Sequence, residues 1–142
     1  MDARIFADAP MGLRHDLLNV PLERRLAYDA QQDVFFVDFE GLSVRTPQDI
    51  AAIRDAVRAA LAPLGRKVDA VVNYDRFSIV PELVDDYVEM VKGLMDAHYH
   101  TVTRYTANGF LRMKLGEELE KRRIPAHFYA SASEAWHGLE TP

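Results

Sequence analysis

Three short polar stretches of this chain carry the residue types that could do chemistry. The first, "RYTANG", places Arg104, Thr106 and Asn108 directly before an amphipathic segment. An exposed helix N-terminus offers free N–H groups and partial positive charge, so this stretch could hold a phosphate or carboxylate, with Arg104 as counter-charge. The other interpretation is that Thr106 or Asn108 caps the helix, while Arg104 pairs with Asp75 or Glu40.

The other two stretches, "FEGL" and "NYDR", follow apolar runs typical of buried strands. In parallel α/β sheets ligands bind outside the carboxyl ends of the strands, so the polar residues after each strand are expected to share one edge. Glu40 could act there as a nucleophile, but no Gly-rich loop accompanies it, which favours a cap or an ion pair. We therefore predict no catalytic residue. The candidates for binding a ligand or anion are Arg104, Thr106, Asn108, Asn73, Asp75 and Arg76.

Metal and cofactor chemistry finds little support in the sequence. Cys is absent, which excludes disulfides, thiolate nucleophiles and zinc-thiolate sites. His98 and His100 flank Tyr99 without a third ligand nearby, so we expect solvated histidines rather than a metal site. Neither a P-loop nor a dinucleotide-binding Gly pattern occurs. No metal and no cofactor is predicted.

The elements that must position these residues alternate between strands and helices. Apolar runs at 33–39, 67–77, 100–106 and 126–130 are typical of strands. Helical periodicity marks 46–65, 81–99, 109–123 and 131–139, with Thr46 as a cap and Pro47 at the first helical position. The aromatic side chains, Phe110 among them, are expected in the core, and Trp136 is expected to cover the sheet or contact another domain.

This alternation predicts an α/β fold with four to five mostly parallel strands and amphipathic helices packed on the sheet. The length of 142 residues fits one domain. We divide the chain into a lead-in or linker segment, 1–32, with no long periodic run, and the α/β domain, 33–142.

The charge and hydropathy of the chain exclude some classes of binding partner. The net charge is −5 with scattered basic residues, which argues against nucleic acid. No apolar run is long enough to span a bilayer, and the N-terminus lacks a signal peptide, so a cytoplasmic protein without membrane contact is expected.

The order of the elements, with "FEGL" after the first strand and "EAWHGL" at the end, resembles a STAS domain, the module of anti-sigma-factor antagonists and sulfate-transporter tails. The resemblance covers residues 33 to 139 and implies a STAS-like fold. In signalling members a Ser before the second helix accepts a phosphate. Here the matching stretch is "YDRFSIVPEL", whose one Ser is Ser78 and which lacks the Ser pair.

A second resemblance spans nearly the whole chain. The stretches "GLRHDLLNVPLERRLAYDAQQDVFFVDFEGLSV", "VVNYDRFSI", "VTRYTANGFLRMKLGEEL" and "EAWHGL" resemble the C-terminal accessory region of long bacterial acyl-CoA:acetate/3-ketoacid CoA-transferases. In that family the catalytic Glu lies in an upstream domain. The resemblance thus implies a non-catalytic accessory domain, for assembly or regulation, whose partner is the upstream catalytic domain and whose strand edge could take an acyl-CoA or small anion.

Three functions remain open from the sequence. The first is the accessory domain of a CoA-transferase-like protein. The second is a free-standing STAS-type interaction module that binds a partner protein through its second helix and Ser78. The third is a small enzyme using Glu40, Asp75 or Arg104. The irregular lead-in favours the first, because a domain packed behind another needs a contact-making segment.

Overall fold

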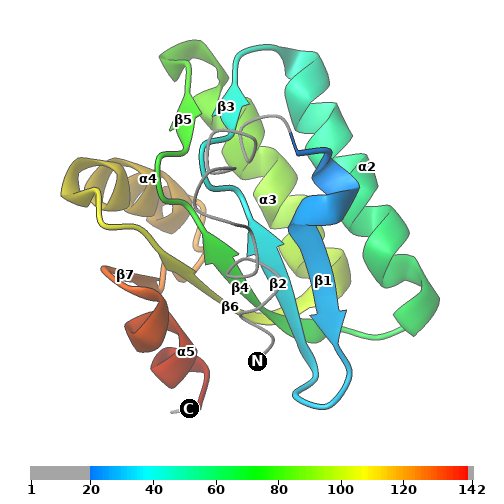
Figure 1. Ribbon diagram of the computed structural model, residues 1–142. Helices are drawn as coiled ribbons and strands as arrows, with labels where there is room; N and C mark the ends of the chain where they lie inside the picture. Colours follow the sequence, from blue (N-terminus) through cyan, green and yellow to red (C-terminus); the bar gives the residue numbers. More distant parts are fainter. Residues whose placement is uncertain (1–19, 141–142) are drawn as a thin grey trace.

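The computed structural model describes residues 20–140, which form a twisted sheet flanked by helices (Figure 1). The main sheet has the order β1-β2-β4-β6-β7. Its strands are β1 (Leu26–Asp29), β2 (Val34–Asp38), β4 (Val68–Asn73), β6 (Tyr99–Tyr105) and β7 (Phe128–Tyr129). The pairs β2–β4, β4–β6 and β6–β7 are parallel, whereas β1 runs antiparallel to β2. The predicted α/β class is confirmed, with a mixed sheet.

Within residues 20–140, four α-helices connect or follow these strands. They are α2 (Pro47–Leu61), α3 (Val84–His98), α4 (Gly109–Lys121) and α5 (Ala132–Glu140). Short 3-10 turns, η2 (Leu22–Arg25), η3 (Ala62–Leu64) and η4 (Pro81–Leu83), stand before or after longer elements. Parallel neighbours that follow each other along the chain place their connecting helices on one face of the sheet, because such crossovers are right-handed. Within the described residues, no helix has the length and apolarity needed to cross a membrane.

The start of α2 shows how local sequence fixes an element. The Thr46 hydroxyl accepts from the Asp49 N–H at 3.2 Å, and the Asp49 carboxylate accepts from the Thr46 N–H at 3.0 Å. This capping box satisfies N–H groups that have no partner inside the helix. The predicted cap at Thr46 is confirmed, as is Pro47 at the first helical position.

The sheet separates two apolar clusters of very different size. The larger one packs β2 and β4 side chains such as Phe35 and Val72 against α2, α3 and α4. The smaller one lies on the opposite face, where Phe36 and Val71 pack with Ala135 of α5. Phe36 and Trp136 are stacked with ring centroids 5.8 Å apart. Trp136 therefore covers the sheet, one of the two roles predicted for it.

The N-terminal boundary differs from the predicted one. Residues 26–29, assigned above to the lead-in, form β1, and Arg25 before it is buried. The predicted boundary at residue 33 thus falls inside the β1–β2 hairpin. The four residues of β1 are all half-buried, so they carry no alternation that would mark a strand. The part of the lead-in before residue 20 lies outside the described residues.

A second, two-stranded sheet was also not predicted. It pairs β3 (Ser43–Val44) with β5 (Ser78–Ile79) in parallel, and Ser43 and Ser78 lie side by side with their hydroxyl oxygens 2.7 Å apart. Strands of two residues are too short to leave a periodic pattern in the sequence. This small sheet joins the segments after β2 and β4, and so helps to fix the loops at the carboxyl edge.

Candidate functional site

The predicted polar edge is present at the carboxyl ends of β2, β4 and β6. Asp38 and Asn73 are register partners, and Asn73 is in turn the partner of Tyr105. The Asn73 amide donates to Asp38 Oδ1 at 3.2 Å and to Glu40 Oε1 at 3.4 Å, and the Glu40 N–H donates to the same Asp38 oxygen at 3.1 Å. Asn73 and Glu40, both predicted for this edge, are thus brought together, and both bond to Asp38, which was not predicted.

Asp75 and Arg76 complete this network on the loop after β4. The Arg76 guanidinium pairs with the Glu40 carboxylate, and the Asp75 carboxylate accepts from the Ala107 N–H at 2.8 Å. The Asn73 side-chain oxygen accepts from the Asp75 N–H at 2.8 Å. The loop after β4 is therefore held to the loops after β2 and β6, which is a structural role for all three predicted residues.

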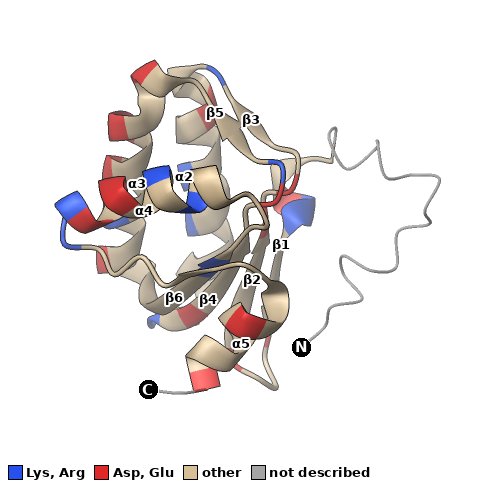
Figure 2. Cartoon of the chain, turned by 90° about the vertical axis from the view of Figure 1, so that its left-hand side faces the viewer, with Lys and Arg blue, Asp and Glu red and all other residues tan. Residues whose placement is uncertain are grey.

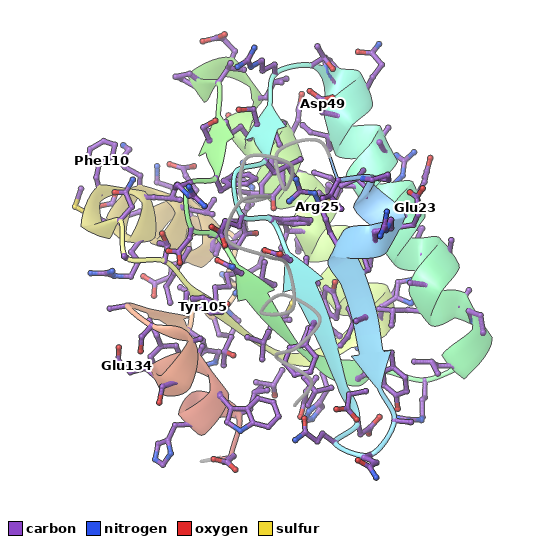
Figure 3. All side chains as sticks on the ribbon, in the orientation of Figure 1. Glu23, Arg25, Asp49, Tyr105, Phe110 and Glu134 are labelled. Atoms are coloured by element: carbon purple, nitrogen blue, oxygen red, sulfur yellow. The ribbon has the colours of Figure 1, made fainter. Side chains whose placement is uncertain are left out.

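Arg25, which was not predicted as a site residue, also binds to the segments of this edge. Its side chain donates to the Asp38 carbonyl at 3.1 Å and to the Glu40 carbonyl at 2.9 Å. Burial lowers the pKa of Arg25, and the nearby Asp38 and Glu40 carboxylates act in the opposite direction. No sequence signal marks this residue, because it lies in an ordinary "LERR" stretch. Figure 3 shows it above β1, pointing towards the strand ends.

Thr106 and Asn108 act as turn and cap residues. Asn108 Oδ1 accepts from the Leu111 N–H at 3.1 Å, which caps α4, and Thr106 Oγ1 accepts from the Asn108 N–H at 3.1 Å. Arg112 donates to the Thr106 carbonyl at 2.7 Å. Of the two interpretations left open for "RYTANG", the cap is the one that the contacts support.

Arg104 lies elsewhere than expected. Its side chain is 1% exposed and belongs to the helix-covered side of the sheet, where it donates to the carbonyls of Pro125 and Ala126 at 3.3 and 2.9 Å. The expected pairing with Asp75 or Glu40 is therefore wrong. Side chains alternate along a strand, so Arg104 points away from the face that Tyr105 occupies. A buried guanidinium bonded to carbonyls cannot serve as the counter-charge for an anion at the edge.

The electrostatics of the edge are acidic. Asp38, Glu40 and Asp75 lie near Tyr105, and burial together with these carboxylates raises the pKa of the Tyr105 hydroxyl. Burial also raises the pKa of Asp38, against the hydrogen bond from the Glu40 N–H. This edge has three carboxylates, and of its cations Arg76 already pairs with Glu40 and Arg25 donates to backbone carbonyls, so it is a poor site for a phosphate or an acyl-CoA.

A different surface, on α4, is apolar. Among residues 20–140, the two large apolar side chains that are exposed both belong to this helix: Phe110 at 69% and Met113 at 51%. Figure 3 shows Phe110 on the outer side of α4, so the expectation that it lies in the core is wrong. The sequence held the signal: Leu111, Leu115 and Leu119 define the inward stripe at helical spacing, and Phe110 lies off it.

A groove of about 240 Å³ runs beside this helix. It lies between the start of α3 and the inner flank of α4, and its lining combines aliphatic side chains with three charged ones: Ile79, Pro81, Val84, Asp85, Leu111, Lys114, Leu115 and Glu118. This is the candidate interaction surface, and it is named the α3–α4 groove below. It was not predicted from the sequence.

Three of the histidines within residues 20–140 lie in or beside α5. His100 lies 3.1 Å from Asp69, and His100, His127 and His137 line a wide hollow of about 1130 Å³ beside α5. His100 and His137 are about three-quarters exposed. Within residues 20–140, no three His or carboxylate side chains are grouped so as to hold a metal ion.

Comparison of the chain with protein families, with curated proteins and with solved structures gives no match. The two family resemblances therefore remain predictions from the sequence.

Proposed function

We propose that this chain is a non-catalytic accessory domain of a CoA-transferase-like polypeptide, acting in assembly or regulation through contact with protein. One observation carries the proposal. The cationic side chains predicted for the strand edge, Arg76 and Arg104, are both engaged by oxygen atoms of the chain itself. A site that binds or activates a substrate needs such groups aimed at the ligand, and here they hold loops together.

The sequence resemblance supports the identity of the parent protein. It spans nearly the whole chain and includes "VVNYDRFSI", whose residues fix the loop after β4. The acidic edge gives no support to the part of the expectation that placed an acyl-CoA or small anion there. What remains is a scaffold that presents a surface to another protein domain.

The test is the mass of the native polypeptide that contains this chain. An antibody raised against the chain should detect, in cell extract, a band several times heavier than 16.1 kDa. The purified chain alone should not move CoA from acetoacetyl-CoA to acetate. Transfer by the chain alone would overturn the proposal, and a band at 16.1 kDa would overturn its accessory-domain form.

The second candidate is a free-standing STAS-type interaction module. The element order β2, α2, β4, α3, β6, α4, β7, α5 is the order on which that resemblance rests. Its specific support is Ser78, which is exposed just before α3 and bonded to Ser43. This candidate predicts a band at the mass of the chain and loss of partner binding in the Ser78→Asp variant. A Ser78→Asp protein that binds its partner normally would argue strongly against it.

A further inference from the structure

The α3–α4 groove has the composition of a protein-docking surface. Its walls are mainly aliphatic. Phe110 is exposed one helical turn before the groove residue Lys114, so the two lie on one face of α4. A single exposed Phe on a protein surface needs no explanation. Here the exposed ring belongs to the helix that forms one wall of an apolar groove, and that combination is typical of binding surfaces.

The size of the groove restricts what can fill it. Pockets for cofactors and drug-sized ligands measure about 300–1,000 Å³ and enclose most of the ligand. A groove of about 240 Å³ on the surface is smaller, and it suits a few inserted side chains better than a whole cofactor. Because α3 and α4 supply most of its walls, the recognition mode that fits is an amphipathic helix laid along the groove.

The acidic residues of the α3 wall favour a partner with positive charge. Residues 81–89 contain four carboxylates and no Lys or Arg. Glu82, Asp85 and Glu89 recur at helical spacing along one flank, and the Asp85 side chain is 79% exposed on the groove. Figure 2 shows acidic positions along α3 beside α4. The Arg122 guanidinium donates to the Asp85 carboxylate at 3.0 Å and to the Glu89 carboxylate at 2.7 Å. These carboxylates therefore already bind one cationic side chain of this chain.

We infer that the α3–α4 groove docks a basic amphipathic helix of a partner protein. Apolar side chains of that helix would enter between Val84 and Leu115 and pack against Phe110. Its Lys or Arg side chains would face the α3 carboxylates, as Arg122 does within the chain. The inference rests on the proposed function, that the domain works through contact with protein, and it names the surface and the chemistry of the partner.

The test uses two labelled synthetic peptides, and both carry Leu residues on one helical face. On the opposite face one peptide carries Lys residues and the other carries Glu residues. Fluorescence anisotropy with the full chain should show binding of the Lys peptide only. The Phe110→Ser variant should weaken binding about tenfold, which corresponds to about 1.4 kcal/mol, because it removes a large apolar side chain from the contact. The Asp85→Asn variant should weaken it about threefold, as expected for one exposed charge.

Two matched control variants distinguish binding in the groove from non-specific binding of the peptide. Met113→Ser removes the other exposed apolar side chain of α4, which lies about 100° around the helix axis from Lys114, and should leave affinity unchanged. Asp96→Asn makes the same charge change at the far, exposed end of α3 and should also have no effect. Circular dichroism of each variant checks that it folds.

Several results would overturn the inference. They are failure of the Lys peptide to bind, equal binding of both peptides, and full affinity in the Phe110→Ser protein. Sedimentation showing a dimer that Phe110→Ser dissociates would assign the groove to a second copy of the chain instead. If the peptides do not bind while the native band is still heavier than the chain, this inference fails and the accessory-domain proposal stands.

Discussion

Arg76 and Arg104 show how much the environment of a residue decides its role. Arg76 follows β4 and pairs with Glu40 at the surface, with 52% of its side chain exposed. Arg104 is buried in β6, where the Pro125 and Ala126 carbonyls accept from its guanidinium. Exposed ion pairs contribute roughly 0–1 kcal/mol, whereas leaving buried acceptors unpaired costs about 1–3 kcal/mol. The same residue type therefore contributes little to stability at one position and more at the other.

This difference gives a paired prediction. Arg104→Met should lower the free energy of unfolding by about 1–3 kcal/mol. The reason is that the Pro125 and Ala126 carbonyls would lose their hydrogen-bond donor, while the apolar packing of the side chain is kept. Arg76→Met should change it by less than about 1 kcal/mol. Urea unfolding of both variants measures the difference. If the two variants were equally stable, the structural role of Arg104 would be refuted and its role as a ligand group would return.

At the scale of elements, α5 is held against the sheet by close contacts. A Cβ built on Gly138 would lie 2.6 Å from the Tyr129 hydroxyl and 2.9 Å from the ring carbon that carries it. Two such approaches require the Tyr129 ring to move. The Gly of "EAWHGL" is therefore needed so that α5 can approach β7 closely.

Substitution of this glycine tests the close approach. Gly138→Ala should destabilise the protein by about 1–3 kcal/mol through overpacking, offset in part by the roughly 0.5–1 kcal/mol that Ala gains within a helix. Gly93→Ala is the matched control, because it lies inside α3 and a Cβ there meets nothing within 4 Å. That variant should be stabilised by about 0.5–1 kcal/mol. Thermal unfolding of the two proteins should shift in opposite directions, and a stabilised Gly138→Ala protein would contradict the packing of α5.

Elements differed in how well the sequence predicted them, and the reason is length. Helices α2 and α3 carry four or more buried residues at helical spacing, and Thr46 caps α2, so pattern and cap chemistry agreed. Strands β3 and β5 have two residues each, and β1 lies at the sheet edge with no alternating burial. Such strands depend on tertiary pairing, which a single sequence does not show.

Only part of the candidate site could be predicted from the sequence. The topology of the sheet was predictable, but the face on which each strand residue lies was not. A parallel sheet brings its strand ends to one edge, so the meeting of Asn73, Asp75 and Asn108 at that edge followed from topology. The face on which a strand residue lies depends on register, and a shift of one residue reverses it. Arg104 and Tyr105 are neighbours in sequence and lie on opposite faces, so the Arg104 side chain is directed away from the edge where it was predicted to meet an anion.

At the scale of the whole molecule, the two faces of the sheet are unequally covered. Helices α2, α3 and α4 bury the large cluster, whereas α5 is packed through the small cluster that contains Phe36, Val71 and Ala135 (Figure 1). The free energy of local opening scales with the apolar contacts that an element makes. Helix α5 should therefore open at a lower free energy than the rest of the domain.

Trp136 makes this prediction measurable, because it is the single Trp of the chain and it stacks on Phe36. In urea, the fluorescence of Trp136 should report the release of α5 at a lower midpoint than far-UV circular dichroism, which reports all helices. Two separate transitions would mean that two-state analysis does not apply to this domain. The Phe36→Leu variant removes the ring that stacks on Trp136. It should lower the urea midpoint measured by fluorescence more than the midpoint measured by circular dichroism. Coincident transitions in both proteins would contradict the picture, since α5 would then belong to one cooperative unit with the core.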